Sequence, residues 1–519
     1  MLHQTPLAIP ELRLLVASFL DYDDVKTCAM VCRAWHRDLQ PIVWRHLTVN
    51  MSKHHKTCTL MKTARMDSIR KNARWIRDFR HMVALGSIVI PELYDILFDH
   101  CRSLLAFEAR ILYDDEWHVL KKLIKLNTGL RQVDLLFTAS PWLLVADLQL
   151  PSILHAHPQL RTFRTNYSMT VSMLLCILHA CPSLEDVRAH IEHSPPWLLD
   201  PDASDGDGKE IKSGNHEASY NPTTMTMTRL RRLELGGACD DPDLSVLLER
   251  SPMLQHLHLA SLPVHVLVGV YRALRAHGPT YLTSLVTDIK KGLPSPLGAL
   301  VQALPSHQLC DVKASSLEAQ EIRMLVGLHH ASLENVRLHI GPGAQEAIVD
   351  LLSQCSRLKT LVVTTTGFAI DARSLVGRGP WACSELELLQ LPIGSPRPCR
   401  NKVVVRSVSI EEGDDEEHEH VSRSSPSPVP PALLPSCCGH QEERDQARVA
   451  FMKSLGCLTK LHGLDLELGH GYRKTAFSEA WPWTLSWNNG LMHLARLAQM
   501  KSLDVGDCQP NVQGNFSEL

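Results

Sequence analysis

A six-residue pattern, L-x-x-L-x-L, recurs along most of this chain and limits what the chain can fold into. Its first and fourth places, and often its sixth, hold Leu or another apolar residue. Nine of the twelve intervals between successive starts are 24 to 30 residues long, which chance spacing of leucines does not give. Repeats of this length are units of a stacked array. The pattern starts at Leu104, Leu130, Leu160, Leu184, Leu230, Leu254, Leu282, Leu309, Leu333, Leu358, Leu386, Leu461 and Met500.

Each repeat joins a short strand to a helix. Helical patterns lie between the strands, for example over residues 171–178 and 344–352. A single strand–helix unit cannot bury its apolar side, so the units stack on one another. For residues 104–505 we therefore predict an α/β fold, a curved solenoid of about 13 irregular leucine-rich repeats with parallel strands on the concave face and helices outside. The alternative is an unrelated helix-rich α/β domain.

Three stretches interrupt the period. Residues 200–224 have few large apolar residues, and residues 397–447 combine an acidic run with Ser and Pro, so both are predicted to be disordered insertions. Residues 469–490 carry three tryptophans, which we interpret as a plug at the end of the solenoid, with a partner-binding surface as the alternative. Residues 506–519 are a C-terminal tail without an evident capping unit, although solenoid ends normally need one. The chain stops early or its tail caps poorly, and the sequence leaves both readings open.

Residues 7–47 contain three short helical segments. Pro10 suits the start of the first helix, because its φ is already fixed and its missing N–H costs nothing there. Asp21 follows an almost wholly apolar first helix and can cap the second. A unit of about 40 residues is at the lower limit for folding alone. Its core cannot cover both sides of the first helix, so the spare apolar surface should meet another surface, in this chain or another.

The N-terminal segment resembles an F-box. The landmarks that carry the resemblance are Ile9-Pro10-Glu11, Leu20-Asp21, Val31-Cys32-Arg33-Ala34-Trp35 and Val43-Trp44. Glu11 follows Pro10 directly, where the family has an intervening residue. The rest of the chain is similar, more loosely, to the irregular leucine-rich repeats of fungal F-box proteins. An ordinary helical cap on the solenoid is the alternative for this segment.

The resemblance implies that residues 7–47 bind a Skp adaptor. The adaptor-binding residues that it indicates are Pro10, Leu14, Leu20, Val31, Trp35 and Trp44.

Residues 48–103 are predicted to be a basic connector and the start of the solenoid. A solvent-exposed helical face explains the excess of Lys and Arg in this connector better than nucleic-acid binding does, so no nucleic-acid partner is predicted. No apolar run approaches the roughly 20 residues of a membrane span, and the first residues lack a signal-peptide pattern. The 15 cysteines form no C-x-x-C pair, which favours a reducing compartment, cytoplasm or nucleus.

Motifs of catalysis are missing from the sequence. It has no P-loop, no G-x-S-x-G, no H-E-x-x-H and no Rossmann glycine pattern. Cys437, Cys438 and His440, with Cys399 upstream, are a poor metal-binding set, because adjacent cysteines do not suit one tetrahedral zinc. We therefore predict no catalytic residue, no metal, no cofactor and no enzymatic activity.

A binding site is predicted on the open face of the strands. Places three and five of the motif point away from places four and six, which are buried. Place five is acidic at both ends of its row and mostly basic in the middle, which suits an acidic or phosphorylated segment of a target protein. The predicted target-binding residues are Arg164, Arg188, Glu234, His258, Lys313 and Arg337.

Together with the F-box resemblance, this surface implies a substrate-recognition subunit of an SCF-type, cullin–RING ubiquitin ligase. Its partners would be the Skp adaptor, a cullin and an unidentified target protein. Such a subunit acts by proximity, because it presents target lysines to a ubiquitin-conjugating enzyme in the same assembly. The alternative is a leucine-rich-repeat scaffold that binds a partner without ubiquitin transfer.

Overall fold

The chain folds into two compact units, Met1–Ser315 (unit 1) and Ser316–Leu519 (unit 2). The structure is a computed structural model. It describes residues 6–51, 62–83, 91–112, 114–138, 150–191, 227, 229–237, 243–260, 264–288, 297–365, 368, 370–376, 380–394, 438–466, 491–494, 497 and 499–504.

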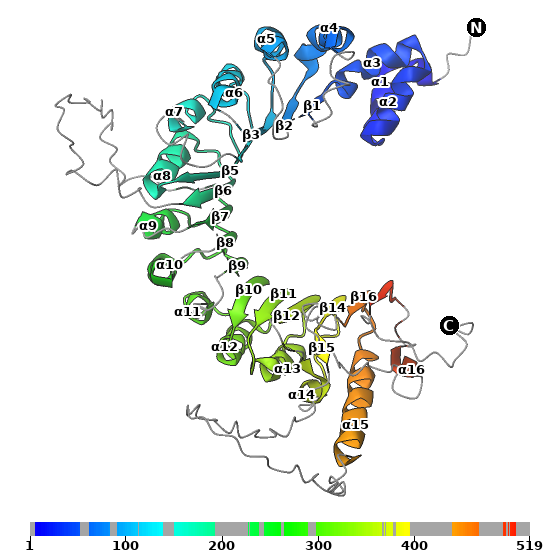
Figure 1. The fold of residues 1–519 in the computed structure, drawn as a ribbon, viewed down its shortest axis with the longest axis vertical. Coiled ribbons are helices and arrows are strands. Elements are labelled where there is room, and N and C mark those ends of the chain that lie inside the picture. Colours follow the sequence, from blue (N-terminus) through cyan, green and yellow to red (C-terminus); the bar gives the residue numbers. More distant parts are fainter. Residues whose placement is uncertain are drawn as a thin grey trace, which may run out of the picture. The chain divides into compact units, whose positions relative to one another are not determined.

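Three helices open unit 1 (Figure 1), and they match the three predicted from the sequence. After a 3-10 turn at Pro6–Ala8 they are α1 (Pro10–Ala17), α2 (Tyr22–Val31) and α3 (Arg33–Val43). Pro10 is the first residue of α1, and the Asp21 carboxylate caps α2 by accepting the Asp24 N–H at 2.9 Å. A small core of Ala17, Val25, Ala29 and Leu39 holds the helices together.

A parallel sheet forms the rest of unit 1, and its strands are neighbours in the order in which they occur in the chain. The helices lie along one side of this sheet (Figure 1). The strands are β1 (His46–Met51), β2 (Asp78–Val83), β3 (Ala106–Ile111), β4 (Gln132–Phe137), β5 (Thr162–Met169), β6 (Asp186–Ile191), β7 (Arg232–Gly236), β8 (His256–Ala260), β9 (Ser284–Asp288) and β10 (Asp311–Leu317), whose last two residues belong to unit 2. The helices are α4 (Lys62–Asn72), the 3-10 helix Ala73–Trp75, α5 (Pro91–His100), α6 (Asp114–Leu126), α7 (Leu150–Leu154), α8 (Val171–Ala180), α9 (Asp243–Glu249), α10 (Val264–His277) and α11 (Leu297–Gln302).

Unit 2 has the same alternation of strand and helix. Its main parallel ladder is formed by β11 (Asn335–Ile340), β12 (Thr360–Thr365), β14 (Leu388–Gln390), β16 (Gly463–Asp465) and β17 (Ser502–Asp504). A second, short ladder pairs β13 (Ile370–Asp371) with β15 (Ile393–Gly394). The helices are α12 (Ala319–His329), α13 (Gln345–Gln354), α14 (Ala372–Val376), α15 (Cys438–Leu455) and α16 (Leu491–Leu494).

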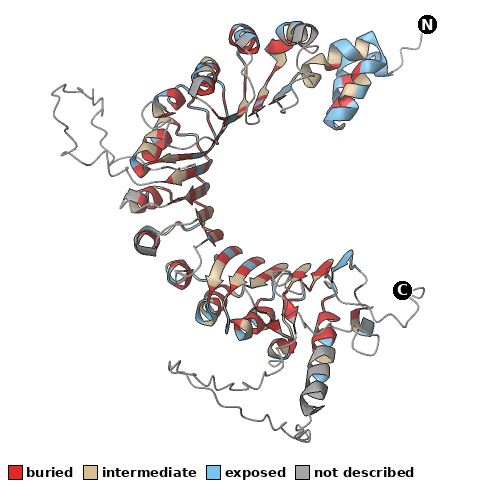
Figure 2. Ribbon diagram, viewed as in Figure 1, coloured by how far each residue is buried: buried red, intermediate tan, exposed pale blue. Residues whose placement is uncertain are grey.

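The predicted repeat register is confirmed within each unit. Fourth-place residues of neighbouring repeats lie opposite each other, as Phe107 does Val133 and Leu361 does Leu389. The first-place leucine is buried in every predicted repeat, and only Met500 at the last start is half-exposed. In Figure 2 buried residues, in red, recur along both the strands and the helices. The described residues therefore form an α/β solenoid of the leucine-rich-repeat kind.

Two predicted boundaries differ from the structure. The strand ladder begins at His46, one residue before the predicted end of the F-box, and β2 lies within residues 48–103, the range predicted to hold the start of the solenoid. The pattern of leucines missed β1 and β2 because Trp44 and Ile76 stand at their first places, where the recognised repeats have Leu or Met. Residues 438–447, predicted to be the end of a disordered insertion, belong to α15, because Glu, Gln, Arg and Ala there are good helix formers.

Other predicted segments lie outside the described residues. These are the insertion 200–224, residues 397–437 of the second insertion, the tryptophan-rich stretch 469–490 and the tail 506–519. Within the described ranges, no helix is long and apolar enough to span a membrane.

His81 is an ionisable residue in the core of unit 1. It occupies the sixth place of its motif in β2, where its side chain is fully buried and its Nδ1 lies 2.6 Å from the Tyr94 hydroxyl oxygen. Burial lowers the pKa of His81 from 6.5 to about 4. The imidazole is therefore neutral in the folded protein at neutral pH.

We expect unit 1 to lose stability as the pH falls from about 6.5 to about 4. Above this range His81 is neutral in both states, whereas within it the unfolded chain binds a proton that the folded chain does not. In His81→Leu this loss should be smaller by about 2 to 3 kcal/mol. Urea unfolding at about pH 7 and about pH 4.5 measures the difference. The lost Tyr94 contact affects both pH values, so an unchanged pH dependence in the variant would contradict the assignment.

Candidate functional site

The first candidate site is the apolar outer surface of α1 and α2. Of the fifteen large apolar side chains that are exposed among the described residues, nine belong to residues 7–31. Phe19 is 82% exposed and Val31 is 70% exposed. Single exposed apolar residues are ordinary, but this density is typical of an interaction surface. The nine are Leu7, Ile9, Leu14, Leu15, Val16, Phe19, Tyr22, Met30 and Val31.

The orientation of α1 explains this exposure. Arg13, although charged, is only 3% exposed, because its side chain points toward α3. Its Nε donates to Asp38 Oδ2 at 2.8 Å, its Nη2 donates to the same oxygen, and its Nη1 donates to the Leu7 carbonyl at 2.6 Å. The Arg13 guanidinium lowers the pKa of Asp38. With Arg13 and Ala17 turned inward, Leu15, Val16 and Phe19 face solvent.

The six predicted adaptor-binding residues divide into two groups. Pro10, Leu14 and Val31 are exposed. Leu20 and Trp35 pack against the small core, and half-buried Trp44 stands where the first place of β1's repeat falls. The F-box landmarks did not single out Leu15, Phe19 and Met30, which the structure exposes. The near-absence of polar residues from Leu12 to Leu20 was the sequence signal for Phe19.

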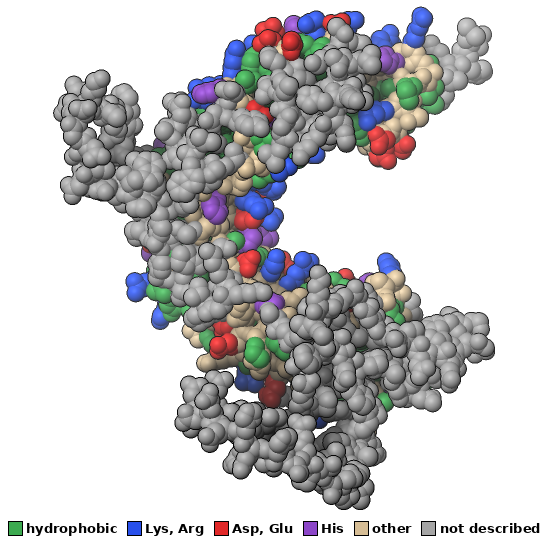
Figure 3. Space-filling model, in the orientation of Figure 1, with side chains coloured by type: hydrophobic (Ala, Val, Ile, Leu, Met, Phe, Trp, Pro, Cys, Tyr) green, Lys and Arg blue, Asp and Glu red, His purple; other side chains and the backbone are tan. Residues whose placement is uncertain are grey.

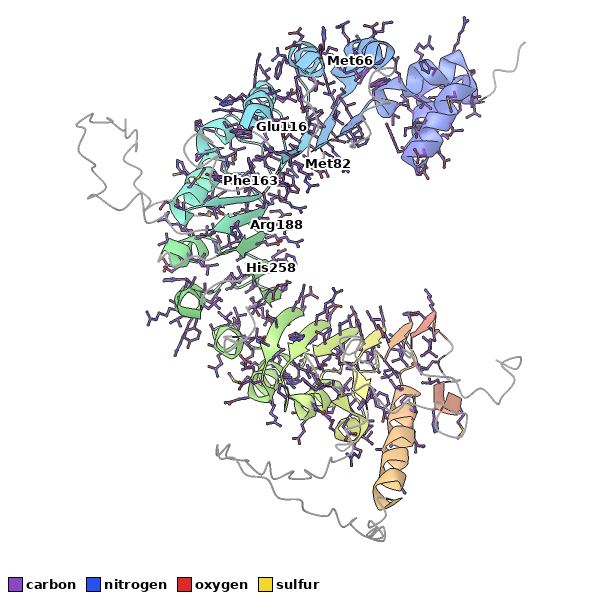
Figure 4. The ribbon with its side chains drawn as sticks, viewed as in Figure 1. Met66, Met82, Glu116, Phe163, Arg188 and His258 are labelled. Atoms are coloured by element: carbon purple, nitrogen blue, oxygen red, sulfur yellow. The ribbon has the colours of Figure 1, made fainter. Side chains whose placement is uncertain are left out.

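The second candidate site is the strand face of unit 1, away from the helices. Register places Arg164 opposite Arg188, Arg188 opposite Glu234, and Glu234 opposite His258. Figure 4 shows Arg188 and His258 on this face, and Figure 3 shows charged and histidine side chains gathered there. Lys313 is in the same row, opposite Val286. Arg337 occupies the corresponding place in unit 2, opposite Val362.

The arginines of this row already have carboxylate partners. Arg164 Nη2 lies 2.7 Å from Asp186 Oδ2, and Arg188 Nε lies 3.1 Å from Glu234 Oε1. The same Glu234 oxygen is 3.1 Å from His258 Nδ1. The basic middle of the row, predicted to attract an acidic segment, is therefore largely balanced by the protein's own carboxylates.

His258 responds to several of these charges. Burial lowers its pKa most, and Lys313 and Arg188 lower it further, whereas Glu234 raises it. In the same row, opposite Arg164, burial raises the pKa of Asp134, as does the charge of Glu108.

In the ranges that the structure describes, no group of three His, Cys, Asp or Glu side chains is placed to hold a metal ion. Cys399, Cys437 and the side chains of Cys438 and His440 lie outside those ranges.

Comparison with known proteins adds little to this geometry. No family model matches the sequence, and no curated protein matches it. Among solved structures, the leucine-rich repeat-containing protein LegL7 from Legionella pneumophila aligns over 59% of this chain and 97% of that chain, at 12% identity and a TM-score of 0.32. A superposition with this TM-score does not establish that the two proteins share a fold. The leucine-rich-repeat fold is assigned from this chain's own register and burial.

We expect Glu234→Gln to lower the pKa of His258 further, because the substitution removes the carboxylate that stabilises the imidazolium. The free energy of unfolding should change by less than about 1 kcal/mol, since the Arg188 partner is 60% exposed. NMR titration measures the pKa, with His258→Gln identifying the resonance. A rise in the pKa would contradict the geometry.

Proposed function

We propose that this chain is the target-recognition subunit of an SCF-type ubiquitin ligase. In this proposal residues 7–47 dock on a Skp adaptor, and the solenoid holds the target protein. The observation that carries it is the exposed apolar surface of α1 and α2, which lies among the landmarks of the F-box resemblance.

Burial of this surface supplies a driving force for docking. Covering one large apolar side chain contributes about 1.5 to 3 kcal/mol. Phe19, Met30 and Val31 are each at least 70% exposed, so each has most of that energy available to a partner. The surrounding polar residues, including Asp23 and Asp24, give it the polar rim that protein interfaces have.

The proposed subunit makes no covalent intermediate and needs no catalytic group of its own. It contributes by holding the target close to a ubiquitin-conjugating enzyme, which replaces a bimolecular encounter by a local one. The stacked repeats support this role, because solenoids offer extended binding surfaces. A scaffold without ubiquitin transfer is the competing function, and capture of a cullin together with the adaptor separates the two.

We expect the double variant Phe19→Glu/Val31→Glu to lose capture of a purified Skp adaptor by about a hundredfold or more, because two charges replace buried apolar contacts. Both side chains are exposed in the free chain, so its unfolding temperature should stay unchanged. Pull-down and calorimetry with the full chain measure binding.

The matched control is Val268→Glu/Tyr281→Glu, which puts the same charges on exposed apolar residues of the solenoid. The control should bind the adaptor as the unaltered chain does. Adaptor capture by the Phe19/Val31 variant at full strength would refute the docking surface. Capture of the adaptor without a cullin would favour the scaffold.

A further inference from the structure

Exposed arginines line the edge of the unit 1 sheet at which the strands begin. The second place of the motif, just before the strand, holds Arg131 ahead of β4, Arg161 ahead of β5 and Arg231 ahead of β7. Arg229 and Arg232 flank Arg231. These five, which we name the arginine edge, are all exposed.

Backbone hydrogen bonds fix these residues in one line. The Arg161 N–H donates to the Arg131 carbonyl at 2.8 Å, and the Glu185 N–H donates to the Arg161 carbonyl at 2.8 Å. The Arg231 N–H in turn donates to the Glu185 carbonyl at 2.9 Å. Neighbouring strands are about 4.8 Å apart, so Arg131 and Arg231 are separated by about 14 Å along the edge.

The charge of the arginine edge is mostly unbalanced. Arg161 lies 3.9 Å from Glu185, with both side chains exposed, so this contact is weak. Within the described part of the chain, Arg131, Arg229, Arg231 and Arg232 are in no ion pair. Arg164 and Arg188, which occupy place five, three residues further along their strands, are both paired. The edge is therefore the more available anion-binding surface of unit 1.

We propose that the arginine edge binds an extended acidic segment of the target protein, an inference that rests on the proposed target-binding role of the solenoid. An extended peptide advances about 3.4 Å per residue, so carboxylates at positions i and i+4 are about 14 Å apart. That distance matches the separation of Arg131 from Arg231. Each guanidinium can then donate two hydrogen bonds to one carboxylate.

The surroundings favour a peptide over a nucleic acid. Single-stranded nucleic acids need aromatic side chains on which bases stack. At places three, five and seven of β4 to β7, which the structure describes throughout, there is no Phe, Tyr or Trp. Glu185 lies in the line between Arg161 and Arg231, so a phosphodiester backbone, which is charged at every nucleotide, would meet it, whereas a peptide can carry its carboxylates on either side of it.

Fluorescence anisotropy with the full chain and a labelled Gly/Ser peptide that carries Glu at every second position tests the proposal. The peptide should bind, more weakly as salt is added, and its Gln counterpart should not. Arg131→Glu/Arg231→Glu should weaken binding by about tenfold or more, whereas Arg131→Lys/Arg231→Lys should retain part of it. The control Lys125→Glu/Arg272→Glu makes the same change in net charge on exposed residues of α6 and α10, and should change affinity by less than about twofold.

Two further probes separate the anion's source. A phosphoserine peptide that binds more tightly, and loses affinity in the Arg131/Arg231 variant, identifies a phosphorylated form of the same acidic segment. Equal binding by this variant and the unaltered chain, or tighter binding of oligothymidylate than of either peptide, overturns the proposal. Skp capture by the same variant keeps the two proposals apart. If the Arg131/Arg231 variant loses peptide binding but still captures the adaptor, the result bears on the arginine edge alone. If the unaltered chain fails to capture the adaptor, the result bears on the docking surface of α1 and α2.

Discussion

Within each unit, the carbonyl oxygen at the second place of the motif ties one repeat to the next. It accepts two N–H groups from the following repeat, as the Arg77 carbonyl accepts those of Leu105 at 2.7 Å and Ala106 at 3.1 Å. The same pair of bonds recurs at Lys359, whose carbonyl accepts the N–H groups of Glu387 and Leu388. This contact sets the register of the strands, and the register decides which side chains are buried and which share the open face.

Backbone register was the predictable part of the fold. A leucine at the first place is buried in repeat after repeat, so its spacing alone located the strands from Leu104 onward. The repeats of β1 and β2 were missed because Trp44 and Ile76 stand at their first places, where the recognised repeats have Leu or Met. The start of α15 was not predicted because its helix-forming residues directly follow a Ser/Pro-rich stretch. The composition of residues 397–447, taken as one range, hid the change.

Side-chain partners were harder to foresee, because they depend on rotamers across neighbouring strands. The sequence placed Arg164 and Arg188 on one face but could not show that Asp186 and Glu234 already neutralise them. Similarly, the sequence shows Arg13 only as a charged residue within an almost wholly apolar segment. In the structure its bond to Asp38 decides which side of α1 faces inward, and thereby exposes Phe19.

The helical unit is joined to the first strand without a linker. α3 ends at Val43, β1 starts at His46, and Gln40 Nε2 donates to Asn72 Oδ1 at 2.5 Å across this junction. Along the sheet of unit 1, the distance of a strand from the N-terminal helices is therefore set by the number of repeats between them, at about 4.8 Å for each strand. Removing or duplicating one repeat between β1 and β4 would move the later strands of unit 1 by one full strand spacing relative to the N-terminal helices. The distance between the apolar surface of α1 and α2 and the arginine edge therefore changes only in whole strand spacings. Evolution or protein design can alter this distance by changing the number of repeats, without changing a residue of either surface.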